Sequence, residues 1–233
     1  MSANLNTNLR QLHERIVHAL AKAGRPATAT TLLAVSKHQA APAVAHLASL
    51  GQSAFGESYL QEALVKIAAL SNVTAAGTPL EWHFIGPLQS NKCRDIAAHF
   101  SWVESVDRLK VAERLNQLRP AHLPPLNILL QVNISKEQRK SGCTPQSLPT
   151  LAAAVAALPR LQLRGLMAIP AATDDPLKQR HAFRELAIAQ QQLIDAGYPL
   201  DTLSMGMSDD LEAAIAEGST QVRVGTALFG ARD

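Results

Sequence analysis

The residue best placed for chemistry is Lys37, which ends the apolar run that begins at Thr31. A short apolar run with a β-branched residue near its end predicts a buried strand, and its charged terminus should emerge at the rim of the sheet. Desolvation of a lysine disfavours its ammonium form, which lowers the pKa and leaves an amine able to attack carbonyl carbon. Lys37 is therefore a candidate for carbonyl chemistry, although a lone lysine at a strand end is more often a solvated residue.

A second group of candidates lies near the C-terminus. Ser208 follows one predicted strand and precedes two aspartates, while Gly225 and Thr226 follow the last predicted strand. Backbone N–H groups at such turns, together with the two hydroxyls, can form a phosphate site. A lysine across from a phosphate site suggests a phosphorylated aldehyde, and pyridoxal 5′-phosphate (PLP) on Lys37 fits that description. Ser208 is equally suited to capping the helix that follows it.

These residues need a fold that brings them together. Apolar stretches alternate with segments of helical periodicity, and eight of them predict strands over 31–37, 53–57, 81–86, 101–104, 126–132, 163–169, 202–205 and 221–224. This alternation predicts an α/β protein with one (β/α)8 barrel over residues 1–233, preceded by an extra amphipathic helix over 4–23. A doubly wound open sheet is the alternative, but the first strand-to-helix turn has no glycine-rich dinucleotide motif.

In a barrel of this kind the ends of all strands share one rim, where the active sites of the fold lie. The residues predicted at that rim are more polar than the strands they follow: Lys37, Glu57 with Ser58, His83 with Gly86, Glu104, Asn133, Met167, Met207 with Ser208, and Arg223 with Gly225 and Thr226. His83 is also explained as a hydrogen-bonded core histidine, and Met207 as a packing residue. Their joint position at strand ends favours a shared site.

Composition bounds the function. The 233 residues are 47% hydrophobic, which is enough for one sizeable core. The net charge of +3 is scattered along the chain, so it is weak evidence for nucleic acid, and a small anionic ligand such as a phosphate explains it as well. Cys93 and Cys143 have no partner at metal-ligand spacing, so neither a disulfide framework nor a zinc site is expected. The N-terminus lacks the pattern of a signal peptide and no stretch predicts a membrane span, so we expect a cytoplasmic protein.

Seven segments carry a resemblance to a known family: AVSK, FGESYLQEA, WHFIGPLQSNK, KSG, RGLMAI, LSMGMSDDLEAAI and RVGTALFG. In this order, they closely resemble the pyridoxal phosphate homeostasis proteins, and the resemblance runs from about Leu5 to the C-terminus. It implies a fold similar to the N-terminal barrel domain of alanine racemase, without that enzyme's second domain, and PLP bound as a Schiff base.

The resemblance also assigns roles to individual residues. Lys37 matches the Schiff-base lysine, and Arg223 matches the arginine near the pyridine nitrogen. Lys140 resembles a second lysine implicated in handling or transferring the cofactor. Ser58 departs from the family, which usually has asparagine there, so its contact to the cofactor ring is open. The phosphate-binding positions of the family fall on Ser208, Gly225 and Thr226.

The arginine at position 223 has a consequence for whether the protein could catalyse reactions with PLP. Most PLP enzymes place a carboxylate against the pyridine nitrogen, whereas the charged Arg223 cannot accept its proton and leaves the ring a weaker electron sink. We therefore expect no efficient catalysis, but a monomeric carrier that buffers PLP and delivers it to apo-enzymes. The alternatives are a PLP-dependent enzyme such as a slow amino-acid racemase, a cofactor-free Schiff-base aldolase and, last, a scaffold.

Overall fold

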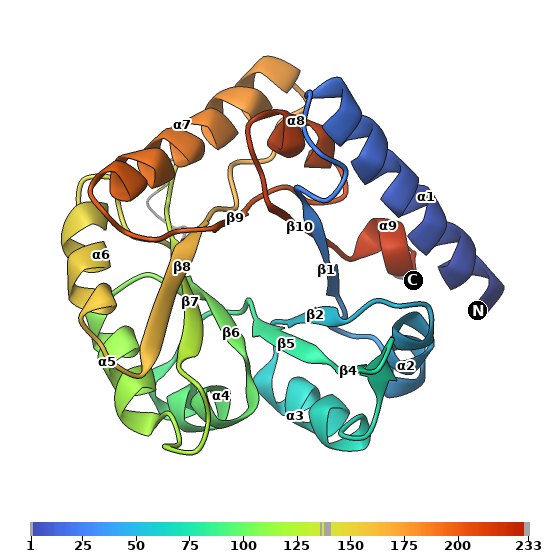
Figure 1. Cartoon of the computed structure of the whole chain (residues 1–233), viewed down its shortest axis with the longest axis horizontal. Coiled ribbons are helices and arrows are strands. Elements are labelled where there is room, and N and C mark those ends of the chain that lie inside the picture. Colours follow the sequence, from blue (N-terminus) through green and yellow to red (C-terminus); the bar gives the residue numbers. More distant parts are fainter. Residues whose placement is uncertain (1, 136, 138–140, 231–233) are drawn as a thin grey trace.

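The structure, a computed structural model, describes residues 2–135, 137 and 141–230. Its central feature is a closed barrel of eight parallel strands in the order β1-β10-β9-β8-β7-β6-β5-β2 (Figure 1), which confirms the predicted architecture. The barrel strands are β1 (Thr31–Val35), β2 (Ala54–Glu57), β5 (Glu81–Phe84), β6 (Trp102–Val106), β7 (Leu126–Gln131), β8 (Leu161–Met167), β9 (Thr202–Ser204) and β10 (Gln221–Val224). All eight overlap the predicted strands.

Helices surround the barrel, because each connection between parallel strands must cross back over the outside of the sheet. They are α1 (Ser2–Lys22), α2 (Ala41–Ser49), α3 (Leu60–Ala69), α4 (Cys93–His99), α5 (Leu109–Leu118), α6 (Leu148–Ala156), α7 (Pro176–Asp195), α8 (Leu211–Ala216) and α9 (Thr226–Phe229), with a 3-10 turn η1 (Ser90–Lys92). The sequence did not predict the small hairpin of β3 (Thr74–Ala75) and β4 (Thr78–Pro79). In the part of the chain that is described, no helix has both the length and the apolar character needed to cross a membrane.

The extra helix α1 lies beside α8 and α9, which follow the last two strands (Figure 1). Its buried face presents a leucine or isoleucine every three or four residues, as the amphipathic pattern predicted. Two side chains tie it to the segments that follow the strands: Arg15 Nη2 donates to the Ser208 carbonyl at 3.1 Å, and Asn8 Nδ2 donates to the Leu228 carbonyl at 2.9 Å. Helix α1 therefore helps to hold the loops after β9 and β10.

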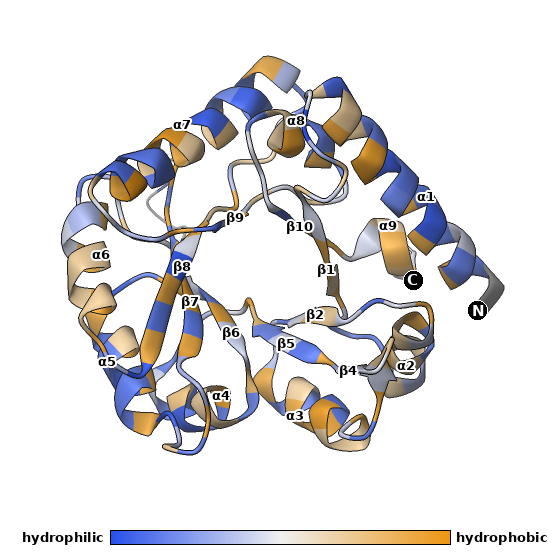
Figure 2. Ribbon diagram, viewed as in Figure 1, coloured by the Kyte–Doolittle hydropathy of each residue, from blue (hydrophilic) through white to orange (hydrophobic). Residues whose placement is uncertain are grey.

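Apolar packing fills the space between barrel and helices, whereas much of the barrel interior is polar. Along β8, hydrophobic and hydrophilic residues alternate (Figure 2), because successive side chains of a strand face the helices and the barrel axis in turn. A small apolar cluster of Trp102, Leu129 and Met167 is separate from the large outer core. Five other side chains that bond to one another complete the buried polar interior: His83, Glu104, Ser204, Gln221 and Arg223.

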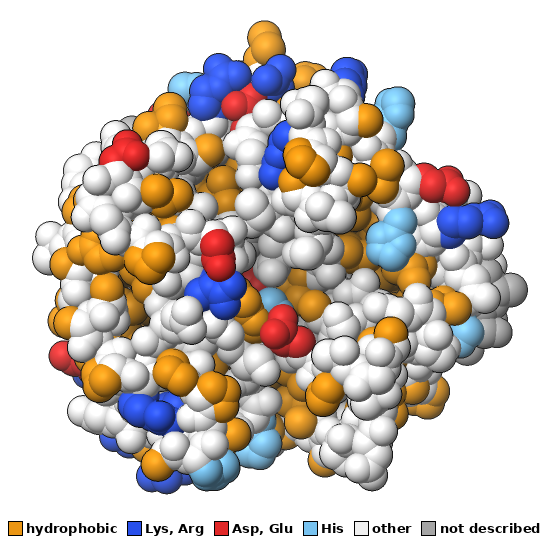
Figure 3. Space-filling model, viewed as in Figure 1, with side chains coloured by type: hydrophobic (Ala, Val, Ile, Leu, Met, Phe, Trp, Pro, Cys, Tyr) orange, Lys and Arg blue, Asp and Glu red, His pale blue; other side chains and the backbone are white. Residues whose placement is uncertain are grey.

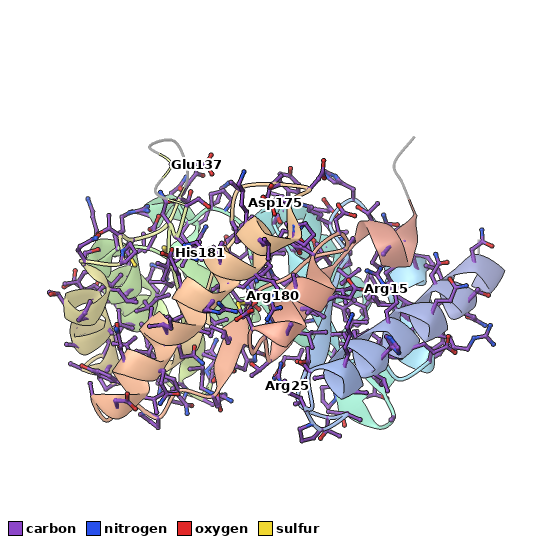
Figure 4. The ribbon with its side chains drawn as sticks, turned by 90° about the horizontal axis from the view of Figure 1, so that it is seen from above. Arg15, Arg25, Glu137, Asp175, Arg180 and His181 are labelled. Atoms are coloured by element: carbon purple, nitrogen blue, oxygen red, sulfur yellow. The ribbon has the colours of Figure 1, made fainter. Side chains whose placement is uncertain are left out.

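The two ends of the barrel are distinct in the side view. Glu137 and Asp175, which follow β7 and β8, lie at one edge, and Arg25, which precedes β1, lies at the other (Figure 4). The first edge is the carboxyl end of the parallel strands, where barrel enzymes carry their sites.

At Gly165, in β8, the backbone comes closer to that of the neighbouring strand β9 than at any other glycine of the barrel wall. A Cβ at this position would overlap the carbonyl oxygen of Thr202 on the neighbouring strand, and the φ of +156° disfavours other residues. We expect Gly165→Ala to lower the free energy of unfolding by more than about 3 kcal/mol in urea titration. Gly51→Ala is the control, because Gly51 also has positive φ but open space around it, so only the backbone cost of about 1–2 kcal/mol applies. Equal losses in the two variants would contradict the steric explanation.

Candidate functional site

A cavity of about 500 Å³ opens at the carboxyl end of the barrel. It is lined by residues at or just after the carboxyl ends of β1, β2, β5, β8, β9 and β10. The residues predicted at the rim from sequence that line it are Lys37, Ser58, Gly86, Met167, Met207, Ser208, Arg223, Gly225 and Thr226. Sequence reasoning missed part of its wall, namely Tyr59, Ile85, Pro87 and Ile169. Lys140 lies outside the described residues, so its role stays a prediction.

The backbone takes an unusual conformation just after β1, next to Lys37. His38, the next residue, has a φ of +65°, in the left-handed region that costs a non-glycine residue about 1–2 kcal/mol. The His38 N–H donates to Glu62 Oε1 at 2.5 Å, and its ring packs against Tyr59 with centroids 4.9 Å apart. These contacts hold the backbone turn that directs Lys37 into the cavity.

A buried ion cluster lies beneath this turn. Lys66 Nζ, on α3, donates to the Ser36 carbonyl at 2.6 Å, to Glu57 Oε1 at 2.5 Å and to Glu62 Oε1 at 2.7 Å. Ser36 Oγ also donates to Glu57 Oε1, at 2.6 Å. Burial raises the pKa of Glu57, although the hydrogen bonds from Lys66 and Ser36 oppose that shift. The cluster fastens the end of β1 to the end of the neighbouring strand β2, beside the cavity.

Sequence patterns did not identify this cluster, because a lysine of an amphipathic helix is expected to face solvent. Leu60, Ala63 and Lys66 are the buried residues of α3 and recur every three residues, which places the lysine on the inner face of the helix. Glu57, predicted to lie at the rim, does not line the cavity, because its carboxylate is buried against Lys66 and Ser36.

Arg223 forms the floor of the cavity. Its side chain is buried, with Nη1 donating to Ser204 Oγ at 2.6 Å and Nη2 donating to the Ala168 carbonyl at 2.8 Å. Burial lowers the pKa of Arg223, and the charges of Glu104 and Asp210 oppose this shift. The guanidinium remains charged even so, because its pKa starts so far above neutrality.

The loops after β9 and β10 form one wall with unused hydrogen-bond donors. The N–H groups of Gly225 and Thr226 donate no backbone hydrogen bond within the described part of the chain. Ser208 does not cap α8, which begins two residues beyond Asp209; instead, its Oγ accepts a bond of 3.2 Å from the N–H of Ala227. Free N–H groups beside two hydroxyls make this corner suited to an anion.

His83 and Glu104 lie elsewhere than the sequence predicted. Both were expected at the rim, but neither lines the cavity at the carboxyl end. His83 lines a separate hollow of about 700 Å³, whose wall includes Thr31, Thr202 and Gln221 at the amino ends of their strands. Glu104 is fully buried in the middle of β6, which continues to Val106 beyond its predicted end. Strand length and side-chain direction account for both differences.

Comparison with known proteins bears on this geometry. Residues 4–233 match the family described as the alanine racemase N-terminal domain. A pyridoxal phosphate homeostasis protein of Pseudomonas aeruginosa is 58% identical over 226 residues, which cover 97% of this chain and 95% of the relative. The structure of PipY from Synechococcus elongatus with PLP bound matches with a TM-score of 0.79 at 35% identity, covering 92% of this chain and 100% of that one. An alanine racemase of Clostridium difficile shares the fold, with a TM-score of 0.77 at 14% identity over 99% of this chain and 60% of that one.

Proposed function

Because the chain belongs to the alanine racemase N-terminal domain family and, within it, to the pyridoxal phosphate homeostasis proteins, we propose that it binds PLP in the cavity at the carboxyl end of the barrel. In this function it buffers the reactive cofactor and delivers it to apo-enzymes that use PLP. The observation that carries the proposal is the meeting of Lys37, Arg223 and the Gly225–Thr226 corner in one cavity. We further infer a monomeric carrier in the cytoplasm.

The residues of the cavity fit the groups of PLP one by one. When bound, the cofactor supplies an aldehyde that condenses with a lysine amine, and Lys37 is the lysine that lines the cavity. The free N–H groups of Gly225 and Thr226, with the hydroxyls of Thr226 and Ser208, suit the phosphate. Arg223 suits the pyridine nitrogen, because only two of the five N–H donors of an arginine bond to described residues.

Arg223 also supports a carrier over an efficient enzyme. A guanidinium donates to the pyridine nitrogen and accepts no proton from it, so it keeps the nitrogen unprotonated and the ring a weak electron sink. A second candidate, slow PLP-dependent turnover of amino acids, is favoured by one observation: Tyr59 lines the cavity together with Lys37. Turnover of D- or L-amino acids by the purified protein, lost in Lys37→Ala, would support this second candidate.

The experiment that tests PLP binding is an absorption spectrum of the purified protein from roughly 300 to 500 nm, before and after borohydride, with peptide mass mapping. We expect a visible band that borohydride removes, with the pyridoxyl mass on the Lys37 peptide. A protein that gains no band even when PLP is added would refute the proposal and favour a cofactor-free aldolase.

Thr226 provides a test of the phosphate corner. We expect Thr226→Val to weaken PLP binding roughly 10- to 100-fold, because a hydrogen bond to a charged group contributes about 1.5–3 kcal/mol. Binding of pyridoxal, which has no phosphate, should change little and serves as the matched control. Equal losses for both ligands would place the effect of Thr226 elsewhere than on the phosphate.

A further inference from the structure

A continuous chain of buried polar groups crosses the barrel from the cavity to the opposite end. From Arg223 it passes to Ser204, then to Glu104, His83 and Glu81, with successive distances of 2.6, 2.7, 2.7 and 3.0 Å. The first four residues are at most 4% exposed, whereas the Glu81 side chain is 46% exposed. The face turned toward the viewer in Figure 3 is hollowed at its centre, with acidic, basic and histidine side chains around it. This chain of hydrogen bonds therefore connects the hollow at the amino end of the barrel to Arg223, on the floor of the cavity at the carboxyl end.

Glu104 is the hub of this chain. Its Oε2 accepts from Ser204 Oγ at 2.7 Å, and its Oε1 accepts from Gln221 Nε2 at 2.6 Å and from His83 Nδ1 at 2.7 Å. Burial by itself would raise the pKa of Glu104, but the hydrogen bond and charge of His83 and the charge of Arg223 outweigh it and lower the pKa. The carboxylate thus stays charged in the centre of the barrel, between two cations.

Both ring nitrogens of His83 face carboxylate oxygens, so the protonated ring is the form that these contacts favour. Burial would lower its pKa, but hydrogen bonds and charges from Glu104 and Glu81 outweigh burial and raise the pKa. Its ring stacks on Trp102 at 5.1 Å with an interplanar angle of 4°, and the Arg164 guanidinium covers the Trp102 ring at 4.7 Å. When protonated, both ring nitrogens donate, so His83 bridges the two carboxylates.

Basic and acidic side chains alternate along this chain of hydrogen bonds, so the groups behind Arg223 affect the electrostatic environment of its guanidinium. A buried ion is tolerated only when paired and fully hydrogen-bonded, and Arg223 contacts its counter-ion only through the hydroxyl of Ser204. The other carboxylate whose charge acts on Arg223 is that of Asp210, on the loop before α8. Glu104, held in turn by His83, therefore compensates the charge of the guanidinium and, through Ser204, helps to hold its direction.

We propose that Glu104 and His83 are positioning residues for Arg223. Through the hydrogen bonds that cross the barrel, their charges set the electrostatic potential that Arg223 presents to the cofactor pocket. The inference rests on the proposed function, since it assigns Arg223 to the ring of bound PLP. It also gives His83 an influence on the site although His83 does not line the cavity. The two residues act with opposite sign: the carboxylate of Glu104 compensates Arg223, and the imidazolium of His83 compensates Glu104.

Because Glu104 and His83 carry opposite charges, substituting each should shift the titration midpoint in opposite directions, which a general loss of structure would not do. We would compare Glu104→Gln and His83→Gln with the wild type by titrating the visible absorbance of the PLP-loaded protein with pH. Glu104→Gln removes the negative charge nearest Arg223, so protonation in the cavity becomes harder and the midpoint should fall. His83→Gln removes a positive charge and keeps an N–H donor for Glu104, so the midpoint should rise. Asp201→Asn is the matched control, because Asp201 lines the same hollow but bonds to Arg164 and lies outside the chain.

Ser204→Ala covers the case in which Glu104→Gln fails to fold. It removes the hydroxyl that accepts from Arg223 and donates to Glu104, which breaks the chain of hydrogen bonds without changing any charge, and we expect PLP affinity to fall about tenfold. Midpoints that stay unchanged or move in the same direction, or wild-type affinity in Ser204→Ala, would overturn the inference. A wild type without a borohydride-reducible band would instead refute the proposed function, which keeps the two failures distinguishable.

Discussion

Lys37→Ala is expected to abolish the borohydride-reducible adduct completely, while PLP still binds reversibly through its phosphate. Lys37 lines the same cavity as Gly225 and Thr226, whose N–H groups donate no hydrogen bond to the described residues, so the amine and the proposed phosphate corner are separate parts of one pocket. The purified variant should therefore lack the visible band, yet retain weak PLP binding that inorganic phosphate displaces. Mass mapping after borohydride measures the adduct, and equilibrium dialysis with and without phosphate measures the reversible part.

Lys110→Ala is the control for this loss, because Lys110 lies exposed on α5 and lines no part of the cavity. It should keep the adduct at the wild-type level. An undiminished adduct at a single other site in Lys37→Ala would show that the assignment to Lys37 is wrong.

Lys66→Met is expected to produce the largest loss of stability. It removes the ammonium that pairs with Glu57 and Glu62 and leaves the fully buried Glu57 carboxylate without its cation. Breaking a buried ion pair on one side costs about 3–5 kcal/mol, and urea titration at neutral pH should give a loss of that size. The same change frees the Ser36 carbonyl next to Lys37, so the adduct on Lys37 should also form more slowly.

The loss in Lys66→Met should depend on pH with a definite sign. Burial already raises the pKa of Glu57, and without Lys66 that pKa rises further. An acid whose pKa is raised in the folded state destabilises the protein above its unfolded-state pKa, and the penalty disappears as the acid becomes protonated. The deficit relative to the wild type should therefore shrink as the pH falls. Adding Glu57→Gln should remove this dependence and recover part of the stability; a deficit that is independent of pH would contradict the ion-pair explanation.

Much of the fold was predictable because its signals are local. An apolar stretch of a few residues followed by a polar one marks a strand end, and the alternation with amphipathic helices predicts parallel strands. Parallel strands bring their carboxyl ends to one edge, so Lys37, Ser208 and Arg223 could be expected to meet although they are far apart in the chain. The hairpin at 74–79 was not predicted, because strands of two residues are too short to show a periodic sequence pattern.

The side chains inside and beneath the barrel were not predictable in this way. Whether a residue in a strand points to the axis or to the helices changes with each position, and how deep it lies depends on where neighbouring strands begin. His83 and Glu104 therefore fell at the rim in the sequence prediction, whereas register places them inside the barrel.

For this protein, the sequence by itself determined the order of the barrel strands and of the helices between them, the barrel, and the residues that end the strands around Lys37 and Arg223. Tertiary structure alone decided which charged groups are buried together. Lys66 is an ordinary lysine of an amphipathic helix until Ser36 and Glu57, on two different strands, surround its ammonium. Likewise, Glu104 becomes the counter-ion of Arg223 only because the closed barrel brings residues more than 100 positions apart within reach of Ser204. A buried charge depends on partners distant in the chain, and a local pattern carries no information about them.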